Sequence, residues 1–165
     1  MTRTKKLALC AIFTALALGL SFMERFIPLP IPLPGIKLGL ANVVTLIALS
    51  LLGTKPAFGI LVARCLLGSL FGGLTGLAFS LGGGVAAFGV MCLSSKAKGL
   101  SVYGVSVLGA ATHNIAQILV AMGLMASPFV GAYLPWLLII SVVTGLVTGG
   151  ICAGVLKVLP KERRV

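Results

Sequence analysis

The sequence contains no aspartate, and its only acidic residues are Glu24 and Glu162. Against these two stand 13 lysines and arginines, which give a formal net charge of +11. In a soluble protein this excess would point to nucleic acid as the partner. The shortage of acids also leaves the apolar segments without a carboxylate that could orient a catalytic base, so we do not expect an enzyme.

Two common kinds of site are missing from the sequence as well. The four cysteines lie inside apolar segments without CxxC spacing, so we expect neither a zinc site nor a disulfide framework. There is no GxxxxGK[ST] phosphate loop, so the chain alone cannot drive a process with ATP. We therefore expect no metal and no cofactor.

Hydrophobic residues dominate what is present. They make up 59% of the 165 residues, only 9% are charged, and the mean hydropathy is +1.19. This composition is far outside that of soluble domains and indicates an all-α integral membrane protein, with a single transmembrane domain over residues 1–165. The first residues could pass for a signal peptide, but Glu24-Arg25-Phe26 offers no small-residue cleavage site, so we expect a retained first span.

Charges and prolines divide the sequence into apolar segments of about the length that a spanning helix needs, roughly 20 residues. The least certain boundary lies between Cys65 and Ser95, where no residue is charged and only the glycine-rich residues 72–76 mark a turn. Reading one helix there would make it far too long for a bilayer. Six transmembrane helices are therefore predicted, at about residues 7–23, 38–53, 56–73, 77–94, 101–126 and 134–156.

The basic residues indicate the topology of these six helices. Six spans put both termini on one side of the membrane, and by the positive-inside rule the side with most lysines and arginines is cytoplasmic. The loops at 24–37, 73–77 and 127–133, with only Arg25 and Lys37, then face outside. The charge is thus a topology signal for a multi-pass protein of a prokaryotic plasma membrane, surrounded by lipid and without nucleic acid. The cytoplasmic side receives Arg3, Lys5, Lys6, Lys55, Lys96, Lys98, Lys157, Lys161, Arg163 and Arg164.

A polar stripe runs along the predicted helix at 101–126. It contains the only histidine, His113, together with Asn114 and Gln117, within about 100° of arc at the helical period. A lone histidine is often a hydrogen-bonded packing residue, but polar groups inside a membrane are costly and usually face a ligand, water or protein. We expect these three side chains to line a binding site, with His113 as a hydrogen-bonding partner and not a proton-transfer catalyst.

Three more polar residues are candidates for the same site. Lys37 and Asn42 are expected at the outer end of the second span, where Lys37 could instead anchor at the interface and Asn42 could bond another helix. Arg64 lies about 12 Å into the membrane, and it could snorkel to the interface or bind something anionic, because no span contains an acid. The prolines at 28–34 predict a stiff outer loop that could act as a lid.

Small residues recur on one face of the first predicted helix. Ala8, Ala11, Ala15 and Gly19 fall close together at the helical period. Such small-xxx-small spacing lets another helix approach closely. The spacing leaves two alternatives open, namely packing within the bundle and docking of another protein.

Two stretches, residues 34–42 (PGIKLGLAN) and 109–117 (GAATHNIAQ), resemble a known family. On these residues the chain is similar to the Gx transporter family, also labelled heptaprenyl diphosphate synthase component I, which is related to the S components of energy-coupling factor (ECF) transporters. The resemblance implies a six-helix S-component-like bundle with a substrate pocket that opens outward. It also implies docking onto a transmembrane T component driven by two cytoplasmic ATPases, with Ala11 and Ala15 matching the AxxxA docking face.

The expected function is therefore capture of a small vitamin-like or cofactor-precursor molecule from outside. Lys37 and Arg64 favour a neutral or anionic substrate, because no acid within the spans would balance a cation. The synthase label does not fit a catalytic role, since prenyl diphosphate synthases hold magnesium through aspartate-rich motifs. The alternative is a non-catalytic membrane subunit or scaffold for isoprenoid, quinone or redox machinery, such as a prenyl diphosphate synthase accessory.

Overall fold

The computed structural model describes residues 3–27 and 36–158, and all regular structure within them is helical. The predicted proline-rich lid at 28–35 and the basic residues Lys161, Arg163 and Arg164 lie outside the described residues. The all-α prediction is confirmed for the rest. The elements are α1 (Arg3–Met23), η1 (Glu24–Phe26), α2 (Asn42–Leu52), α3 (Thr54–Ser94), α4 (Val102–Met125), η2 (Pro128–Tyr133) and α5 (Leu134–Val158).

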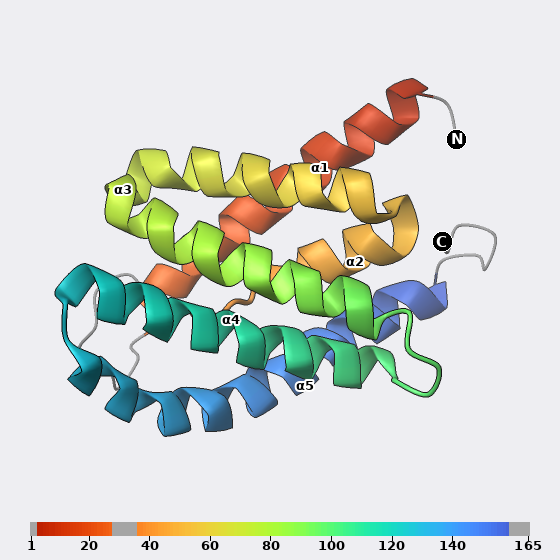
Figure 1. Ribbon diagram of the computed structural model, residues 1–165. Helices are drawn as coiled ribbons and strands as arrows, with labels where there is room; N and C mark the ends of the chain where they lie inside the picture. Colours follow the sequence, from red (N-terminus) through yellow and green to blue (C-terminus); the bar gives the residue numbers. More distant parts are fainter. Residues whose placement is uncertain (1–2, 28–35, 159–165) are drawn as a thin grey trace.

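The long helix α3 turns back on itself at Gly73, so that its two halves run side by side in opposite directions (Figure 1). Gly73 has φ 63° and ψ −169°, a backbone conformation that only glycine adopts without strain. The two halves pack against each other, and the ring centroids of Phe58 in the first half and Phe88 in the second are 5.5 Å apart. The turn predicted at residues 72–76 is thus confirmed.

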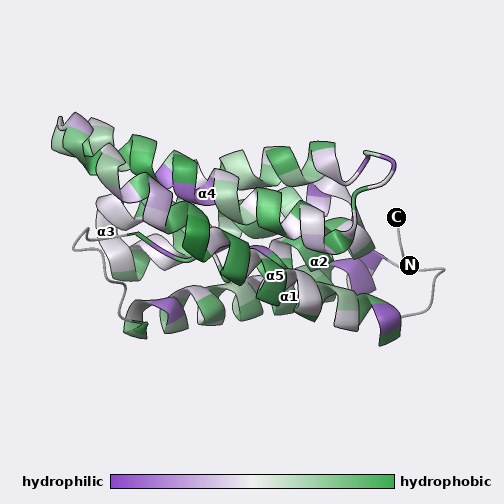
Figure 2. Cartoon of the chain, turned by 90° about the horizontal axis from the view of Figure 1, so that it is seen from below, coloured by the Kyte–Doolittle hydropathy of each residue, from purple (hydrophilic) through white to green (hydrophobic). Residues whose placement is uncertain are grey.

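Four stretches are long and apolar enough to cross a membrane, which makes the chain a multi-pass membrane protein. Hydrophobic colours cover most of the helices, and hydrophilic residues are concentrated at the ends and at a few interior positions (Figure 2). The α2 helix, with 11 residues, spans only about 16 Å. The four stretches are Arg3–Met23, Thr54–Ser94, Val102–Met125 and Pro128–Val158.

The helix predicted at 38–53 is wrong at its start, because helical structure begins only at Asn42. Gly39 has φ +80°, and its carbonyl accepts from the Asn42 N–H at 2.9 Å. The Leu40 N–H donates to the Glu24 carboxylate instead of to a helical carbonyl. These bonds hold residues 36–41 in a non-helical path that enters the bundle before α2 begins.

The ends of the helices sort as the topology predicted. The start of α1, the α2–α3 and α3–α4 connections and the end of α5 lie at one end of the bundle, and the Gly73 turn and the α4–α5 connection lie at the other (Figure 1). Lys55, Lys96, Lys98 and Lys157 therefore belong to one end. That this end is cytoplasmic stays a prediction.

Helix α5 packs on α4 through small residues. A Cβ atom at Gly145 would lie 2.5 Å from the Val107 Cα, and one at Gly149 would lie 2.9 Å from the Tyr103 Cα, so the two backbones are in direct contact. Next to them the hydroxyls of Ser106 and Thr148 are 2.7 Å apart and share a hydrogen bond. The small residues Gly145, Thr148 and Gly149 therefore form the surface of α5 that packs on α4.

This contact predicts the outcome of one matched pair of substitutions on α5. Gly145→Ala places a methyl group inside the distance that Val107 permits and should lower the free energy of unfolding by about 1–3 kcal/mol. Gly154→Ala, where a Cβ meets nothing within 4 Å, should leave stability unchanged or raise it by up to about 1 kcal/mol. Denaturant unfolding in detergent measures both, and equal stability of the two variants would contradict the packing.

Candidate functional site

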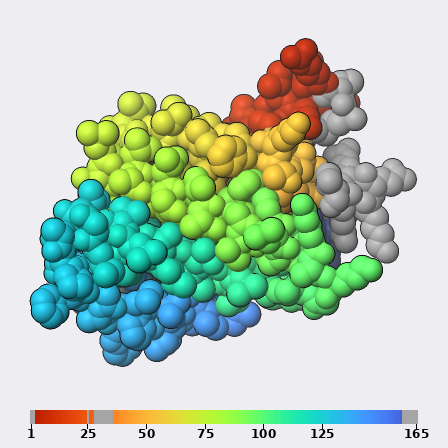
Figure 3. Space-filling model, in the orientation of Figure 1, coloured from red at the N-terminus to blue at the C-terminus, as the bar shows by residue number. Residues whose placement is uncertain are grey.

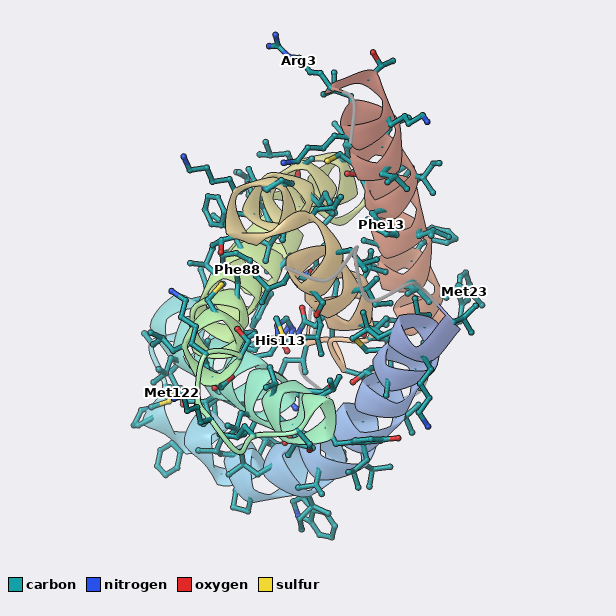
Figure 4. The ribbon with its side chains drawn as sticks, turned by 90° about the vertical axis from the view of Figure 1, so that its right-hand side faces the viewer. Arg3, Phe13, Met23, Phe88, His113 and Met122 are labelled. Carbon is teal, nitrogen blue, oxygen red and sulfur yellow. The ribbon has the colours of Figure 1, made fainter. Side chains whose placement is uncertain are left out.

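A layer of polar side chains crosses the middle of the bundle between two buried apolar clusters. Along α4, Val105 belongs to one cluster and Ile118 to the other, and along α3 the corresponding residues are Ala87 and Phe79. On these two helices, the polar residues Ser80, His113, Asn114 and Gln117 lie between the two clusters. Seen along the helices, His113 is inside the ring that they form (Figure 4). This polar layer is the candidate site.

The three polar side chains of α4 are almost completely buried. His113 is 2% exposed, and Asn114 and Gln117 are 0% exposed. Asn114 Nδ2 donates to the carbonyl oxygen of Leu137 on α5 at 3.1 Å. The predicted stripe is therefore an inward-facing surface that α5 covers on one side.

Lys37 closes the layer on the other side. Its main-chain N–H donates to Gln117 Oε1 at 3.1 Å, and its Nζ donates to Ser80 Oγ on α3 at 2.9 Å. The side chain is half-buried and bonds to protein, so the role of a simple interfacial anchor does not describe it. Residues 36–39 thereby connect α3 to α4 across the layer.

The imidazole of His113 lies between two segments of main chain. A Cβ atom at Gly83 would be 2.8 Å from the ring atoms Nδ1 and Cε1, and one at Gly39 would be 3.1 Å from Cδ2. Real Cβ atoms do not approach a ring nitrogen as closely as 2.8 Å, so the ring needs glycine at position 83, while a side chain at position 39 would press against it. The positive φ of Gly39 adds a second reason for glycine there.

Arg64 points into the layer and is 6% exposed, so the snorkelling alternative is wrong. Its Nη2 donates to Asn42 Oδ1 at 3.0 Å, and its Nη1 donates to Ser21 Oγ of α1 at 3.5 Å. Asn42, the first residue of α2, is also 6% exposed. The structure thus brings together Arg64, Asn42 and Lys37 with the α4 stripe, and that these residues bind a substrate stays a prediction.

Glu24 is a member of the site that sequence reasoning missed. The sequence predicts it in the outer loop at 24–37, but it is 6% exposed and accepts a hydrogen bond from the Leu40 N–H. Burial raises the pKa of its carboxyl, and the Leu40 amide, Arg64 and Lys37 oppose part of that rise. The premise that no acid reaches Arg64 is therefore wrong. The signal available in the sequence was that Glu24 is the only acid before Glu162.

Seven buried nitrogen and oxygen atoms, on five residues of this layer and on Thr45 of α2, have no hydrogen-bond partner among the described residues. Each such atom costs about 1–3 kcal/mol when it stays unpaired. Together they would cost about as much as the whole net stability of a typical protein, roughly 5–15 kcal/mol. The layer therefore needs partner groups beyond the described residues. The atoms are Nδ2 of Asn42, Oγ1 of Thr45, Nε of Arg64, Nδ1 and Nε2 of His113, Oδ1 of Asn114 and Nε2 of Gln117.

A model of the family described as heptaprenyl diphosphate synthase component I matches residues 13–156. The chain belongs to this family. The resemblance seen in two short stretches is thereby confirmed over most of the sequence. Comparison with curated proteins and with solved structures finds no match. The match to the heptaprenyl diphosphate synthase component I family includes the whole polar layer, from Glu24 to Gln117.

The small-residue face of α1 lies on the outside of this family member. Ala8, Ala11, Ala15 and Gly19 are all exposed, and a Cβ atom at Gly19 would meet nothing within 4 Å. Packing of this face within the bundle is therefore wrong. Ala15 falls within the family match, whereas Ala11 precedes it.

The role of Glu24 predicts the effect of two substitutions. Glu24→Met removes the acceptor of the Leu40 N–H and the only acid near Arg64 within residues 3–27 and 36–158, so the free energy of unfolding should fall by about 1–3 kcal/mol. Glu24→Gln keeps an oxygen acceptor for Leu40 and should lose clearly less. Unfolding of both variants in detergent tests this, and a methionine variant as stable as the wild type would show that the carboxylate holds nothing in place.

Proposed function

We propose that this protein is the substrate-binding subunit of an ECF-type importer and that the polar layer around His113 holds the substrate. The observation that carries the proposal is the group of seven buried polar atoms that find no partner among the described residues, because a small molecule that matches them would remove their cost. The substrate would be a small vitamin-like or cofactor-precursor molecule that enters from outside.

The same layer supports binding better than catalysis. The described residues place no hydrogen-bonding carboxylate or other partner on His113 Nε2, so nothing orients the ring as a general base. The family description names a prenyl diphosphate synthase, but a sequence without aspartate lacks the usual magnesium ligands of such an enzyme. That description favours one second candidate, a non-catalytic membrane subunit of isoprenoid, quinone or redox machinery.

The proposed membrane topology has six crossings with both termini in the cytoplasm. Each half of α3 makes one crossing, and α2 completes its own crossing together with the non-helical residues 36–41. The gathering of Lys55, Lys96, Lys98 and Lys157 at one end supports the orientation, since basic residues concentrate on the cytoplasmic side. The polar layer then lies between the two membrane surfaces.

The proposed energy source is a transmembrane T component with two cytoplasmic ATPases, docked on α1. Only Ala17 of α1 is fully buried, and the helix lies at the edge of the bundle, with its first turns projecting beyond it (Figure 3). The exposed faces of Ala11 and Ala15 would let a partner helix approach the α1 backbone.

Substrate occupancy can be tested by native mass spectrometry of the purified protein. The wild type should release a small molecule on denaturation, and His113→Ala combined with Asn114→Ala should reduce its amount at least about tenfold, because each side chain contributes about 1–3 kcal/mol of matched hydrogen bonding. Ser106→Ala is the control, since its partner Thr148 keeps its bonds to α5 carbonyls. A wild type that releases nothing, together with unchanged uptake by the double variant, would falsify the binding role.

Docking can be tested by co-purification with the T component and ATPases. Ala11→Leu and Ala15→Leu should each lower recovery of these partners at least about fivefold, because the larger side chain separates the helices, with no change in thermal stability. Gly123→Leu is a matched control on α4, where the residue is exposed and a Cβ meets nothing within 4 Å. Equal losses in all three variants would show that α1 is not the docking face.

A further inference from the structure

The hydrogen bonds already present in the polar layer fix which end of each side-chain amide is left unpaired. Asn42 Oδ1 accepts from Arg64, and Gln117 Oε1 accepts from a main-chain N–H, so their nitrogen atoms remain. Asn114 is reversed, because its nitrogen donates to a carbonyl of α5 and its oxygen remains. These three residues are the only asparagines and glutamines in the sequence.

The unpaired atoms are therefore mostly hydrogen-bond donors. Asn42 Nδ2, Gln117 Nε2 and Arg64 Nε can only donate, and Asn114 Oδ1 can only accept. The Thr45 hydroxyl and the His113 ring can do either. A molecule that satisfies the layer must bring more acceptors than donors.

Two of these residues, Asn42 and Gln117, lie beside the ring of His113. A Cβ atom at Gly39 would be 3.0 Å from Asn42 Nδ2 and 3.1 Å from His113 Cδ2. A Cβ atom at Gly83 would be 2.8 Å from His113 and 3.0 Å from the Gln117 Cγ. Asn42 Nδ2 and the Gln117 side chain thus both lie beside the His113 ring, in the same part of the layer.

The charges of the layer act in the same direction. Arg64 and Lys37 are both positive, and Glu24 is the only acid that interacts with them among the described residues. Whether Glu24 is ionised or neutral, positive charge remains in excess. The positive charges of Arg64 and Lys37 would repel an organic cation, and the donors of that cation would face groups that are themselves donors.

We propose that the site binds an organic molecule that presents two or more oxygen acceptors on one edge, as a carboxylate or as neighbouring ring carbonyls, and that it rejects organic cations. Asn42, Gln117 and Arg64 donate to this edge, while Asn114 Oδ1 accepts from a donor beside it. The inference rests on the proposed binding function and specifies the chemistry of its ligand.

Three small probes test this chemistry on the full-length protein in detergent. Benzoate offers a carboxylate, uracil offers two ring carbonyls around an N–H, and benzylammonium is a cation of similar size. At least one acceptor probe should bind, and benzylammonium should bind at least about tenfold more weakly by titration calorimetry or ligand-observed NMR. Binding of benzoate without uracil identifies a carboxylate, and the reverse identifies ring carbonyls.

Two variants connect the result to the named donors. Asn42→Asp keeps the oxygen that Arg64 binds but replaces the free donor by an acceptor, and Gln117→Met removes a free donor without adding charge. Each should weaken the acceptor probe about tenfold, and Ser106→Ala should not. Melting temperatures identify any variant that fails to fold, and the other variant then decides.

Benzylammonium binding as tightly as the better acceptor probe, absence of binding by both acceptor probes, or unchanged affinity in the folded variants would overturn the inference. These outcomes are distinct from failure of the proposed function. If the protein releases a small molecule but prefers benzylammonium, binding stands and this ligand chemistry is wrong. If it releases nothing and supports no uptake, the binding function itself is wrong.

Discussion

The burial of the Arg64 guanidinium is the constraint on which the rest of the structure depends. An isolated charge inside a membrane protein is very costly unless hydrogen bonds and an opposite charge compensate it. Asn42 and Ser21 supply the hydrogen bonds, and Glu24 supplies the charge. These three residues come from α2, α1 and η1, so the side chain of Arg64 on α3 interacts with all three preceding elements of the chain. The same need explains why residues 36–41 are not helical, since the Leu40 N–H turns toward Glu24.

The layer around Arg64 also determines where small residues are needed. The His113 ring fits because Gly83 and Gly39 leave room beside it, and α5 reaches Asn114 because Gly145 lets it approach α4 closely. Apolar clusters on both sides separate the layer from the two ends of the bundle. A polar group in such a place is electrostatically strong and costly to leave unpaired, because the surrounding dielectric is low.

The features that the sequence predicted correctly depend on residues close together in the chain. The stripe of His113, Asn114 and Gln117 depends only on helical spacing, and the turn at Gly73 follows from the length that a bilayer allows. What it missed depends on contacts between distant residues. Glu24 bonds to a main-chain N–H 16 residues away, and every residue but proline has such a group, so no side-chain pattern reveals the pair. The position of Arg64 along α3 likewise does not reveal whether its side chain points inward or toward lipid, because the residues of α3 are apolar on every face of the helix.

The two candidate functions make different physical demands on the interior. A scaffold needs only surfaces, such as the exposed face of α1, and its core is most stable when apolar residues fill it. This chain instead places its only histidine and all three of its side-chain amides in one buried layer, and within the part of the chain that the structure describes one end of each amide has no partner. Each of those atoms lowers the stability of the protein alone and contributes only when a partner supplies the missing bond. Such an interior is disadvantageous for a scaffold and is what selective binding of a small molecule requires, which is why we favour substrate capture.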